Sequence, residues 1–302
     1  MVENPASVPR TVLFLTYANY RYESFAISYI LSVLSHVDNS VVEIFVDDVP
    51  AFTKRFKLAL DAMSELFGGE RFRISRVDHA LLKGKTLPNS IRFLVTPTSS
   101  AEFVYIGDVD IIVLERDILA RHLRFMQHTG LPYSNSVRFT DRSRMSGLHF
   151  SYFKAYYPVP DVSDLDTQRL NDEMLLRILC ERKNYPIQDK VWFRPVHGIH
   201  ASPNRQPLPS KNAKGRAIPG WDFEAHSWAY RRFRRSAAFR TVAPLFDDTI
   251  KDVFRTLDQL FLTLHWKQMN RLSSNGVLKL ASFRCAMAFL SMVGRKPFGS
   301  PL

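Results

Sequence analysis

The sequence predicts an α/β protein with a mostly parallel sheet flanked by helices, followed by a helical, basic C-terminal extension. Short apolar runs rich in β-forming residues alternate with segments of helical periodicity over the first hundred residues, an alternation typical of βαβ units. The last part of the chain has helical periodicity, and a cluster of basic residues lies just before it. The chain of 302 residues is long enough to bury a substantial core.

The first hundred residues contain the clearest elements. TVLFLTY is a short apolar run of the kind found in buried parallel strands. The strands expected in this part are 11–17, 41–48, 71–78 and 103–106, and the helices are one beginning near Glu23, one over 51–66 closed by Gly68 and Gly69, and a short one over 89–95. Ligands of a parallel sheet bind beyond the carboxyl ends of its strands. We therefore look for a site in the residues that follow these strands.

The rest of the chain is less regular before it becomes helical. We expect a helix over 167–183, a strand over 190–197, a loop or linker over 202–220, and helices over 250–272 and 277–293. The expected organisation is an α/β domain over 1–215 and a helical region over 216–302.

Charge and cysteine content limit the classes of protein. The formal net charge is +12, and the segment 205–240 carries nine Lys or Arg residues against two acidic ones. Such a segment attracts phosphates of nucleic acids, lipids or nucleotides. Cys180 and Cys285 are too few and too far apart for a disulfide framework, which favours a reducing compartment. With no signal peptide and no run of 18 apolar residues, we expect a cytoplasmic protein, soluble or peripheral on the inner face of a membrane.

The most informative motif is YIGDVDIIV, in which Asp108 and Asp110 directly follow an apolar strand. In an extended segment the two carboxylates point to the same side and can approach one cation. Oxygen ligands suit Mg²⁺ or Mn²⁺, either of which keeps positions open for a diphosphate. The alternative is a solvated turn that happens to contain two acids. The apolar flanks favour the metal site, because carboxylates beside a buried strand need a partner.

This order of motifs resembles the GT-A type glycosyltransferases, and more closely the retaining transferases that include glycogenin and the bacterial lipooligosaccharide galactosyltransferases. The similarity spans about residues 11–205. In that family a loop after the first strand holds the base, and Asn19 and Tyr20 match it. Tyr17 stands where the family usually has an aspartate that contacts uracil. Ordinary turn chemistry is the alternative for these residues.

The resemblance also implies roles for residues on either side of the Asp-x-Asp motif. Arg92 matches an arginine that reaches the nucleotide-sugar, with a surface arginine as the alternative. Ser146 and Gly147 match the small residues beneath the donor sugar. Asp172 and Glu173 match the catalytic positions near the sugar's reactive carbon, where a carboxylate could stabilise or attack an oxocarbenium-like centre. Acids that suit a helix dipole are the alternative.

The segment FRPVHGIHASPNR at 193–205 resembles the part of the family that completes the metal site. The family has a histidine, then a glycine and a lysine for the phosphates. Here Gly198 directly follows His197, so either His197 or His200 could be the ligand, and Arg205 is the candidate to replace the lysine. An imidazole beside two carboxylates fits Mn²⁺ somewhat better than Mg²⁺.

The function that the resemblance implies is transfer of a sugar from a nucleotide-diphosphate sugar, expected to be UDP-linked, to a saccharide or lipid-linked acceptor. Glycine-rich phosphate loops, the nucleophile elbow of hydrolases and H-E-x-x-H are missing from the sequence, so the diphosphate must be held by a cation and basic side chains. The rivals are a nucleotidyltransferase and a nucleic-acid-binding protein. We expect no nucleic-acid partner.

Arginines and aromatic residues are interleaved over 228–240. This composition fits an anionic membrane surface, a nucleic acid, or a helix face packed against the catalytic domain. The resembling bacterial transferases attach to membranes through such a region, which favours the membrane surface.

Overall fold

The computed structural model describes residues 10–83, 86–135, 137–138, 141–167, 169–187, 197–211, 215 and 217–272. The chain divides into two compact units, one ending at Phe254 and the other beginning at Arg255. Every candidate site residue belongs to the first unit. No helix in the described ranges combines the length and apolarity needed to cross a membrane.

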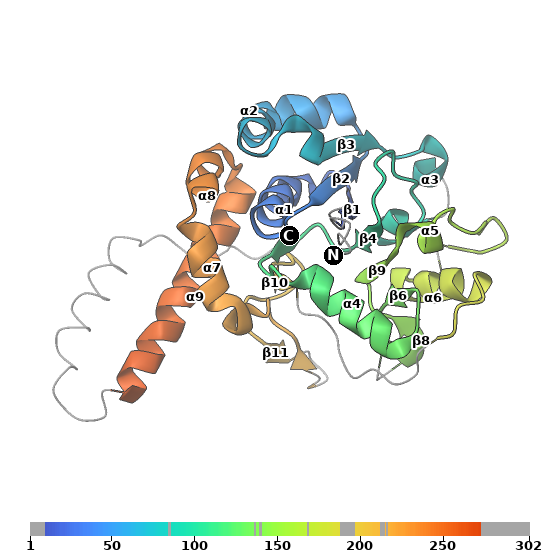
Figure 1. Cartoon of the computed structure of the whole chain (residues 1–302). Helices are drawn as coiled ribbons and strands as arrows, with labels where there is room; N and C mark the ends of the chain where they lie inside the picture. Colours follow the sequence, from blue (N-terminus) through green and yellow to red (C-terminus); the bar gives the residue numbers. More distant parts are fainter. Residues whose placement is uncertain are drawn as a thin grey trace, which may run out of the picture. The chain divides into compact units, whose positions relative to one another are not determined.

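A six-stranded sheet forms the centre of the first unit (Figure 1). Its strands, in spatial order, are β3 (Phe72–Arg76), β2 (Ser40–Val46), β1 (Val12–Ala18), β4 (Phe103–Ile106), β9 (His149–Tyr152) and β6 (Tyr133–Ser134). The first four are parallel, whereas β9 runs antiparallel to both β4 and β6. The expected α/β class with a mostly parallel sheet is confirmed.

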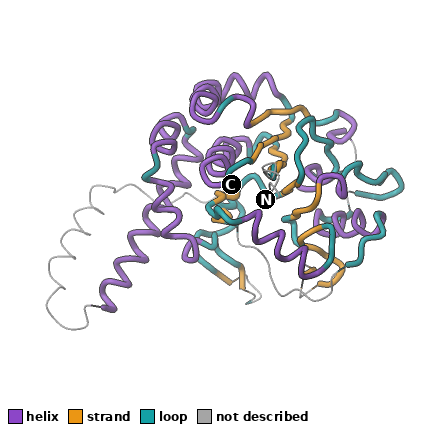
Figure 2. Tube along the Cα trace, in the orientation of Figure 1, coloured by secondary structure: helices purple, strands orange, loops and turns teal. Residues whose placement is uncertain are grey.

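Helices lie on both sides of the strands (Figure 2). They are α1 (Glu23–His36), α2 (Val49–Phe67), α3 (His79–Lys83), α4 (Ile118–Thr129), α5 (Phe153–Tyr156), α6 (Asp172–Arg182), α7 (Phe223–Arg234), α8 (Ala237–Val242) and α9 (Asp248–Leu272), with 3-10 turns η1 (Gly69–Arg71), η2 (Pro88–Phe93) and η3 (Ala243–Leu245). Three small antiparallel pairs complete the described elements: β5 (Ile111–Val113) with β10 (Gly198–His200), β7 (Val137–Arg138) with β8 (Asp141–Met145), and β11 (Ser210–Lys211) with β12 (Ala217–Ile218).

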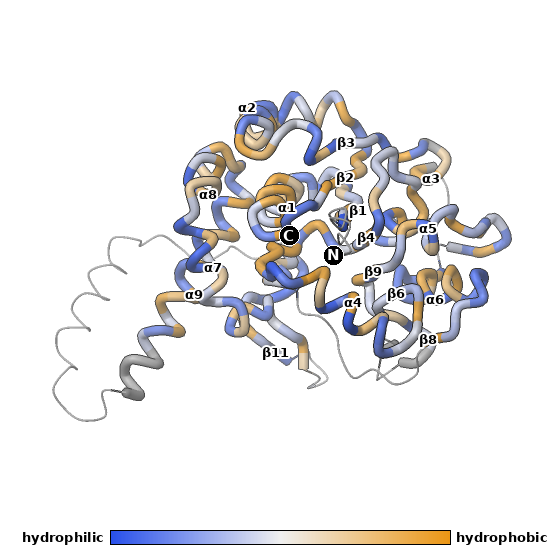
Figure 3. The backbone as a smooth tube through the Cα atoms, viewed as in Figure 1, coloured by the Kyte–Doolittle hydropathy of each residue, from blue (hydrophilic) through white to orange (hydrophobic). Residues whose placement is uncertain are grey.

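The sheet buries both faces, as expected of parallel strands with apolar sequences. Leu13 and Leu15 pack with residues of η2 and α6 in one apolar cluster. Phe14 points to the opposite face, where its ring lies 5.0 Å from that of Tyr105. Helix α1 is buried along most of its length and is mainly apolar (Figure 3). Successive residues of β1 therefore pack on opposite faces of the sheet.

Three expected elements differ from the structure or lie outside the described residues. Helix α6 begins at Asp172 rather than at 167, because the Asn171 side chain caps it by accepting a hydrogen bond from Met174 N at 2.8 Å. Most of the expected strand over 190–197 lies outside the described residues. So does the whole helix expected over 277–293, including Cys285.

The basic segment is folded against the first unit. Helix α8 contacts α1 and α2, and Tyr230 and Phe233 of α7 are buried. Trp228 projects from the same helix with 62% of its surface exposed. The expected functional boundary near residue 215 stays a prediction, but residues 217–254 contribute to the packing of the first unit.

Candidate functional site

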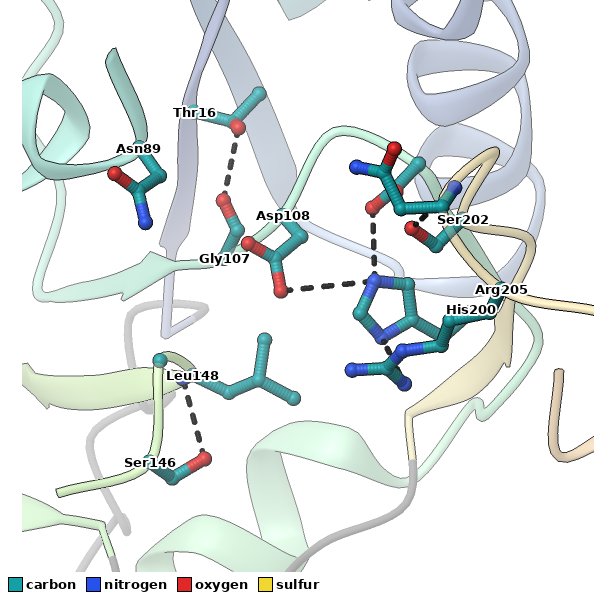
Figure 4. A network of polar contacts seen from close by, with 12 residues as sticks. Thr16, Asn89, Gly107, Asp108, Ser146, Leu148, His200, Ser202 and Arg205 are labelled. Atoms are coloured by element: carbon teal, nitrogen blue, oxygen red, sulfur yellow. Dashed lines mark hydrogen bonds and ion pairs between the residues drawn. The ribbon is translucent and has the colours of Figure 1, made fainter. Parts of the chain in front are cut away.

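A cluster of two carboxylates and an imidazole lies where β4 ends. One ligand atom from each of Asp108, Asp110 and His200 can be chosen so that all lie within 4.8 Å of one another. The His200 Nε2 atom is 3.0 Å from Asp110 Oδ1 and 3.8 Å from Asp108 Oδ2. Figure 4 shows the His200 ring between Asp108 and the loop that carries Ser202 and Arg205.

Backbone contacts bring these distant residues together. Thr16 Oγ1 donates a hydrogen bond to Gly107 O at 2.8 Å, which ties the turn after β4 to the end of β1 (Figure 4). Strand β5 then pairs with β10, and Ala201 N donates to Asp110 O at 2.9 Å. The antiparallel pairing thus places His200 directly beside the Asp-x-Asp turn.

Electrostatic interactions favour the ionised forms of Asp110 and His200. Burial alone would raise the pKa of Asp110, but the charge and hydrogen bond of His200, with a hydrogen bond from Ser202, hold that pKa below its usual value. Burial alone would lower the pKa of His200, but Asp110 and Asp108 raise it. Each group of the pair therefore favours the charged form of the other.

Arg92 joins the metal-ligand cluster to the start of α6. Its Nη2 atom is 3.0 Å from Asp108 Oδ1 and 2.7 Å from Asp172 Oδ2, and its side chain is only 5% exposed. The same nitrogen donates to Gly147 O at 3.3 Å, and Nη1 donates to Asn89 O at 2.6 Å. Burial raises the pKa of Asp172, and Arg92 opposes that rise. Arg92 is thus a buried bridge between two carboxylates, and the surface-arginine alternative does not hold.

Gly147 lies in contact with this bridge. A Cβ atom at Gly147 would meet Arg92 Nη2 at 2.9 Å and Asp172 Oδ2 at 3.3 Å. Ser146 is buried, and its backbone N–H and C=O both bond to the amide of Asn135. The two small residues therefore form a wall next to the arginine, with Ser146 Oγ accepting from Leu148 N.

Glu173 has a different environment from its neighbour Asp172. Its Oε2 atom is 2.6 Å from Arg144 Nη2, and its side chain is 6% exposed. Of the two expected catalytic acids, Asp172 is the one connected through Arg92 to the metal-ligand cluster.

His197 belongs to an interior network, not to the cluster. Its Nδ1 atom is 2.8 Å from the Tyr105 hydroxyl, and its Nε2 atom is 2.9 Å from His122 Nε2. His122 continues to Ser134 Oγ at 2.8 Å. Burial lowers the pKa of His122 to about 3, so this ring is neutral at physiological pH. His200, and not His197, therefore lies with the two aspartates.

Gly198 serves the strand pairing. A Cβ atom there would lie 1.9 Å from Ile112 O, and the residue has φ +152°. The close approach of β10 to β5 requires the absence of a side chain. Gly198 thus lets β10 carry His200 to the cluster, and nothing in its contacts requires a phosphate.

The three residues expected at the base have mixed environments. The Tyr17 hydroxyl donates to Asp47 Oδ1 at 2.6 Å, and burial first, then this bond, raise its pKa. Asn19 makes turn contacts, its carbonyl accepting from Tyr22 N and Glu23 N. Tyr20 is 66% exposed. The Tyr17 side chain is therefore held by Asp47, the residue that follows β2.

Several site residues carried no recognised sequence signal. Burial raises the pKa of Tyr22, as do the charges of Asp110 and Asp108, and Asn204 Nδ2 donates to the Tyr22 hydroxyl at 2.6 Å. Tyr22 follows Tyr20 by two positions, so the same loop motif could have suggested it. Ser202 could have been suggested only by its nearness to His200.

Arg205 lies next to the imidazole of the cluster. Its Nη1 atom is 3.4 Å from His200 Nδ1, and Figure 4 shows a dashed line joining the two side chains. A guanidinium group at this position can meet an anion that approaches the two aspartates.

The donor set fits a divalent cation. Two carboxylates and one imidazole, within 4.8 Å of one another, match the ligands preferred by Mn²⁺ and leave further positions free for other oxygens. The guanidinium group of Arg92 lies 3.0 Å from Asp108 Oδ1, and His200 Nε2 lies 3.0 Å from Asp110 Oδ1, so each of the two acids has a partner beside the buried strand.

No protein-family model matches the sequence, and no curated protein matches it. Solved structures do match. The glycosyltransferase GlyE of Streptococcus pneumoniae TIGR4 is 13% identical, with a TM-score of 0.42, over 56% of this chain and 43% of its own. The galactosyltransferase LgtC, in complex with donor and acceptor sugar analogs, is 12% identical, with a TM-score of 0.37, over 58% of this chain and 65% of its own.

Two further structures match over more of the chain. The mannosyltransferase PcManGT of Pyrobaculum calidifontis, in complex with GDP-Man and Mn²⁺, is 12% identical, with a TM-score of 0.43, over 95% of this chain and 81% of its own. A cytidylyltransferase of Leptospira borgpetersenii is 10% identical, with a TM-score of 0.41, over 82% of this chain and 96% of its own. Less than two thirds of GlyE and of LgtC is covered. The activity of this chain must therefore be inferred from its own residues.

Proposed function

We propose that this chain is a divalent-cation-dependent glycosyltransferase that moves a sugar from a nucleotide-diphosphate sugar to a saccharide or lipid-linked acceptor. The observation that carries the proposal is the cluster of Asp108, Asp110 and His200 at the carboxyl end of a parallel strand. It lies where a parallel sheet binds its ligands. The resemblance in motif order supports a UDP-linked donor.

The three cluster residues would hold Mn²⁺ or Mg²⁺. A bound cation would neutralise charge on the departing diphosphate, where charge develops in the transition state. Arg205 lies beside His200 on the same loop and would contact a phosphate oxygen. Arg92 would fix the orientation of Asp108, because its guanidinium group contacts that carboxylate at 3.0 Å.

Asp172 is the acid that we assign to the reacting carbon of the donor sugar. Its link to Asp108 through one nitrogen of Arg92 supports this role. An ionised Asp172 could stabilise an oxocarbenium-like centre or attack it, consistent with retention of configuration. Glu173 pairs with Arg144 at 2.6 Å, and we propose that it positions α6.

A panel of nucleotide sugars with Mn²⁺, scored by thermal shift and by donor hydrolysis, tests the proposal. A true donor should raise the melting temperature by mass action. Asp108→Ala and Asp110→Ala should abolish both signals. Asp117→Ala is the matched control, because this aspartate follows the same motif but is exposed and paired with Arg121.

Full donor hydrolysis in EDTA, or by the Asp108→Ala/Asp110→Ala double variant, would contradict the proposal. A parallel assay supplies CTP or UTP with a sugar phosphate and measures pyrophosphate. Metal-dependent pyrophosphate release, without hydrolysis of any nucleotide sugar, would identify a nucleotidyltransferase instead.

We also propose that this chain is attracted electrostatically to an anionic membrane surface. Helix α7 exposes Trp228, and Arg232 and Arg235 are exposed on the same segment. Trp221, by contrast, is only 6% exposed, and the other aromatic residues expected at the interface, Tyr230, Phe233 and Phe239, are buried. The described aromatic side chains therefore support surface attraction more than insertion.

A further inference from the structure

A second polar hollow lies away from the Asp-x-Asp turn. It has a volume of about 530 Å³ and is lined by the end of α1, the loop between β5 and α4, and one face of α7. Asp108 and Asp110 precede β5, whereas the lining residues Glu115 and Arg116 follow it. The hollow is therefore at the opposite end of β5 from the proposed donor site. Its volume lies within the range of sites for small molecules.

Three buried polar atoms of the lining have no hydrogen-bond partner among the described residues. They are Ser35 Oγ, Glu115 Oε2 and His226 Nε2, which come from α1, the β5–α4 loop and α7. Buried polar atoms are nearly always bonded, so each such atom calls for an explanation. Because the three belong to three different elements that line one hollow, a single occupant with hydroxyl groups could satisfy them all.

Guanidinium groups dominate the charge of the lining. Arg121 is engaged, since it lies 3.2 Å from Glu115 Oε1 and 2.9 Å from Asp117 Oδ2. Arg116 and Arg232 form no ion pair within the described part of the chain, and both are exposed at the rim.

The two rim arginines also lie near one ring. Burial lowers the pKa of His36, and the positive charges of Arg116 and Arg232 lower it further. Two uncompensated guanidinium groups on one side of a hollow match the oxygens of a phosphate.

We propose that this hollow binds a phosphate monoester or diester that carries free hydroxyl groups, with the phosphate at Arg116 and Arg232 and the hydroxyls at Ser35, Glu115 and His226. The ligand chemistry is that of a phosphorylated polyol, whether it comes from a soluble compound or from a phospholipid headgroup. The proposal does not depend on the sugar-transfer function.

The test is isothermal titration of the full chain, in EDTA, with inorganic phosphate and with glycerol phosphate. Glycerol phosphate should bind wild type more tightly than phosphate does. The Arg116→Gln/Arg232→Gln variant should weaken binding of glycerol phosphate by about tenfold or more, as expected for lost charged hydrogen bonds. The matched control is Arg124→Gln/Arg240→Gln, which removes the same charge from exposed positions outside the lining.

A second variant separates the hydroxyl contacts from the phosphate contacts. Glu115→Ala should remove the preference for glycerol phosphate over inorganic phosphate while phosphate itself still binds, because alanine lacks the oxygen that meets the hydroxyl groups. Equal losses in the rim variant and its control would overturn the proposal, and so would a wild type that binds neither compound. A preference that survives Glu115→Ala would overturn the assignment of the hydroxyls.

Vesicles of phosphatidylglycerol, compared with phosphatidylcholine, distinguish the two sources. Co-sedimentation with the former that is lost in the rim variant but not in its control would identify a lipid headgroup. Binding of glycerol phosphate without vesicle binding would identify a soluble ligand. Both results support the same site, because both require the rim arginines.

Discussion

Removing Arg92 should destabilise the protein far more than removing an exposed arginine with an equal number of partners. The Arg92 side chain is 5% exposed and contacts Asp108 and Asp172, whose side chains are 28% and 15% exposed. In Arg92→Met the two carboxylates lose the guanidinium group that they share, at a position where water solvates them poorly. Breaking a buried pair from one side costs about 3–5 kcal/mol, and we expect a loss of about 3 kcal/mol because Asp108 keeps some solvent.

Arg55→Met is the matched comparison. Arg55 also contacts two carboxylates, Asp247 at 2.8 Å and Glu23 at 3.7 Å, but its side chain is 47% exposed. Solvent screens such a pair, so its loss should cost less than about 1 kcal/mol. Both variants replace arginine with methionine, and each arginine has two carboxylate partners. The two sites differ chiefly in how deeply the arginine is buried.

Urea unfolding in EDTA, followed by far-ultraviolet circular dichroism, gives the two free energies of unfolding. Excess Mn²⁺ should restore part of the loss in Arg92→Met, because a cation can replace the arginine beside Asp108 but not beside Asp172. Arg92→Lys, which keeps the charge but not the fork, should fall between wild type and Arg92→Met. The reasoning fails if Arg92→Met loses no more stability than Arg55→Met.

Three further substitutions test other parts of the structure. His200→Ala should weaken Mn²⁺ binding by at least about tenfold in isothermal titration. His197→Ala should leave that affinity unchanged and lower the free energy of unfolding by about 2 kcal/mol, because its interior hydrogen bonds are lost. Equal effects of the two variants on Mn²⁺ affinity would refute the assignment of His200 as the ligand. Gly198→Ala should lower the free energy of unfolding by about 3 kcal/mol or more, because its Cβ would meet Ile112 O at 1.9 Å. Gly130→Ala, where φ is +67° and the space around the residue is open, should lower it by only about 1 kcal/mol. Burial raises the pKa of Glu115 from 4.5 to about 7, so its contribution to stability is fully present below pH 4.5 and is lost as the pH rises through 7. Glu115→Gln should therefore flatten the fall in stability over that interval by about 3 kcal/mol, and an unchanged pH profile would show that the carboxyl group is solvated.

The parallel part of the fold could be predicted because its sequence signals are local. The apolar run of β4 followed by the Asp-x-Asp turn defines both a buried strand and the point where it ends. The structure has that strand over Phe103–Ile106. The antiparallel strand β9 was not predicted, since HFSY is short and begins with a histidine that is buried by tertiary packing.

The parts of the site that depend on long-range register could not be read from the sequence. His197 and His200 flank the same glycine, and only the pairing of β10 with β5 decides which ring reaches the aspartates. Likewise, Arg92 matched an arginine expected to contact a ligand, but the shorter of its two ion pairs is with Asp172, 80 positions away. Neither a helical period nor a motif specifies such a pair.

The pairing of β5 with β10 has a consequence for how the chain folds. It joins residues about ninety positions apart, and closing a loop of that length costs on the order of 4 kcal/mol of chain entropy. A cation held by Asp108, Asp110 and His200 would bridge the two ends of this loop, acting as a reversible cross-link. Contacts so distant in sequence form slowly. The acquisition of cation affinity during refolding would therefore mark the moment at which the two halves of the first unit have found their register.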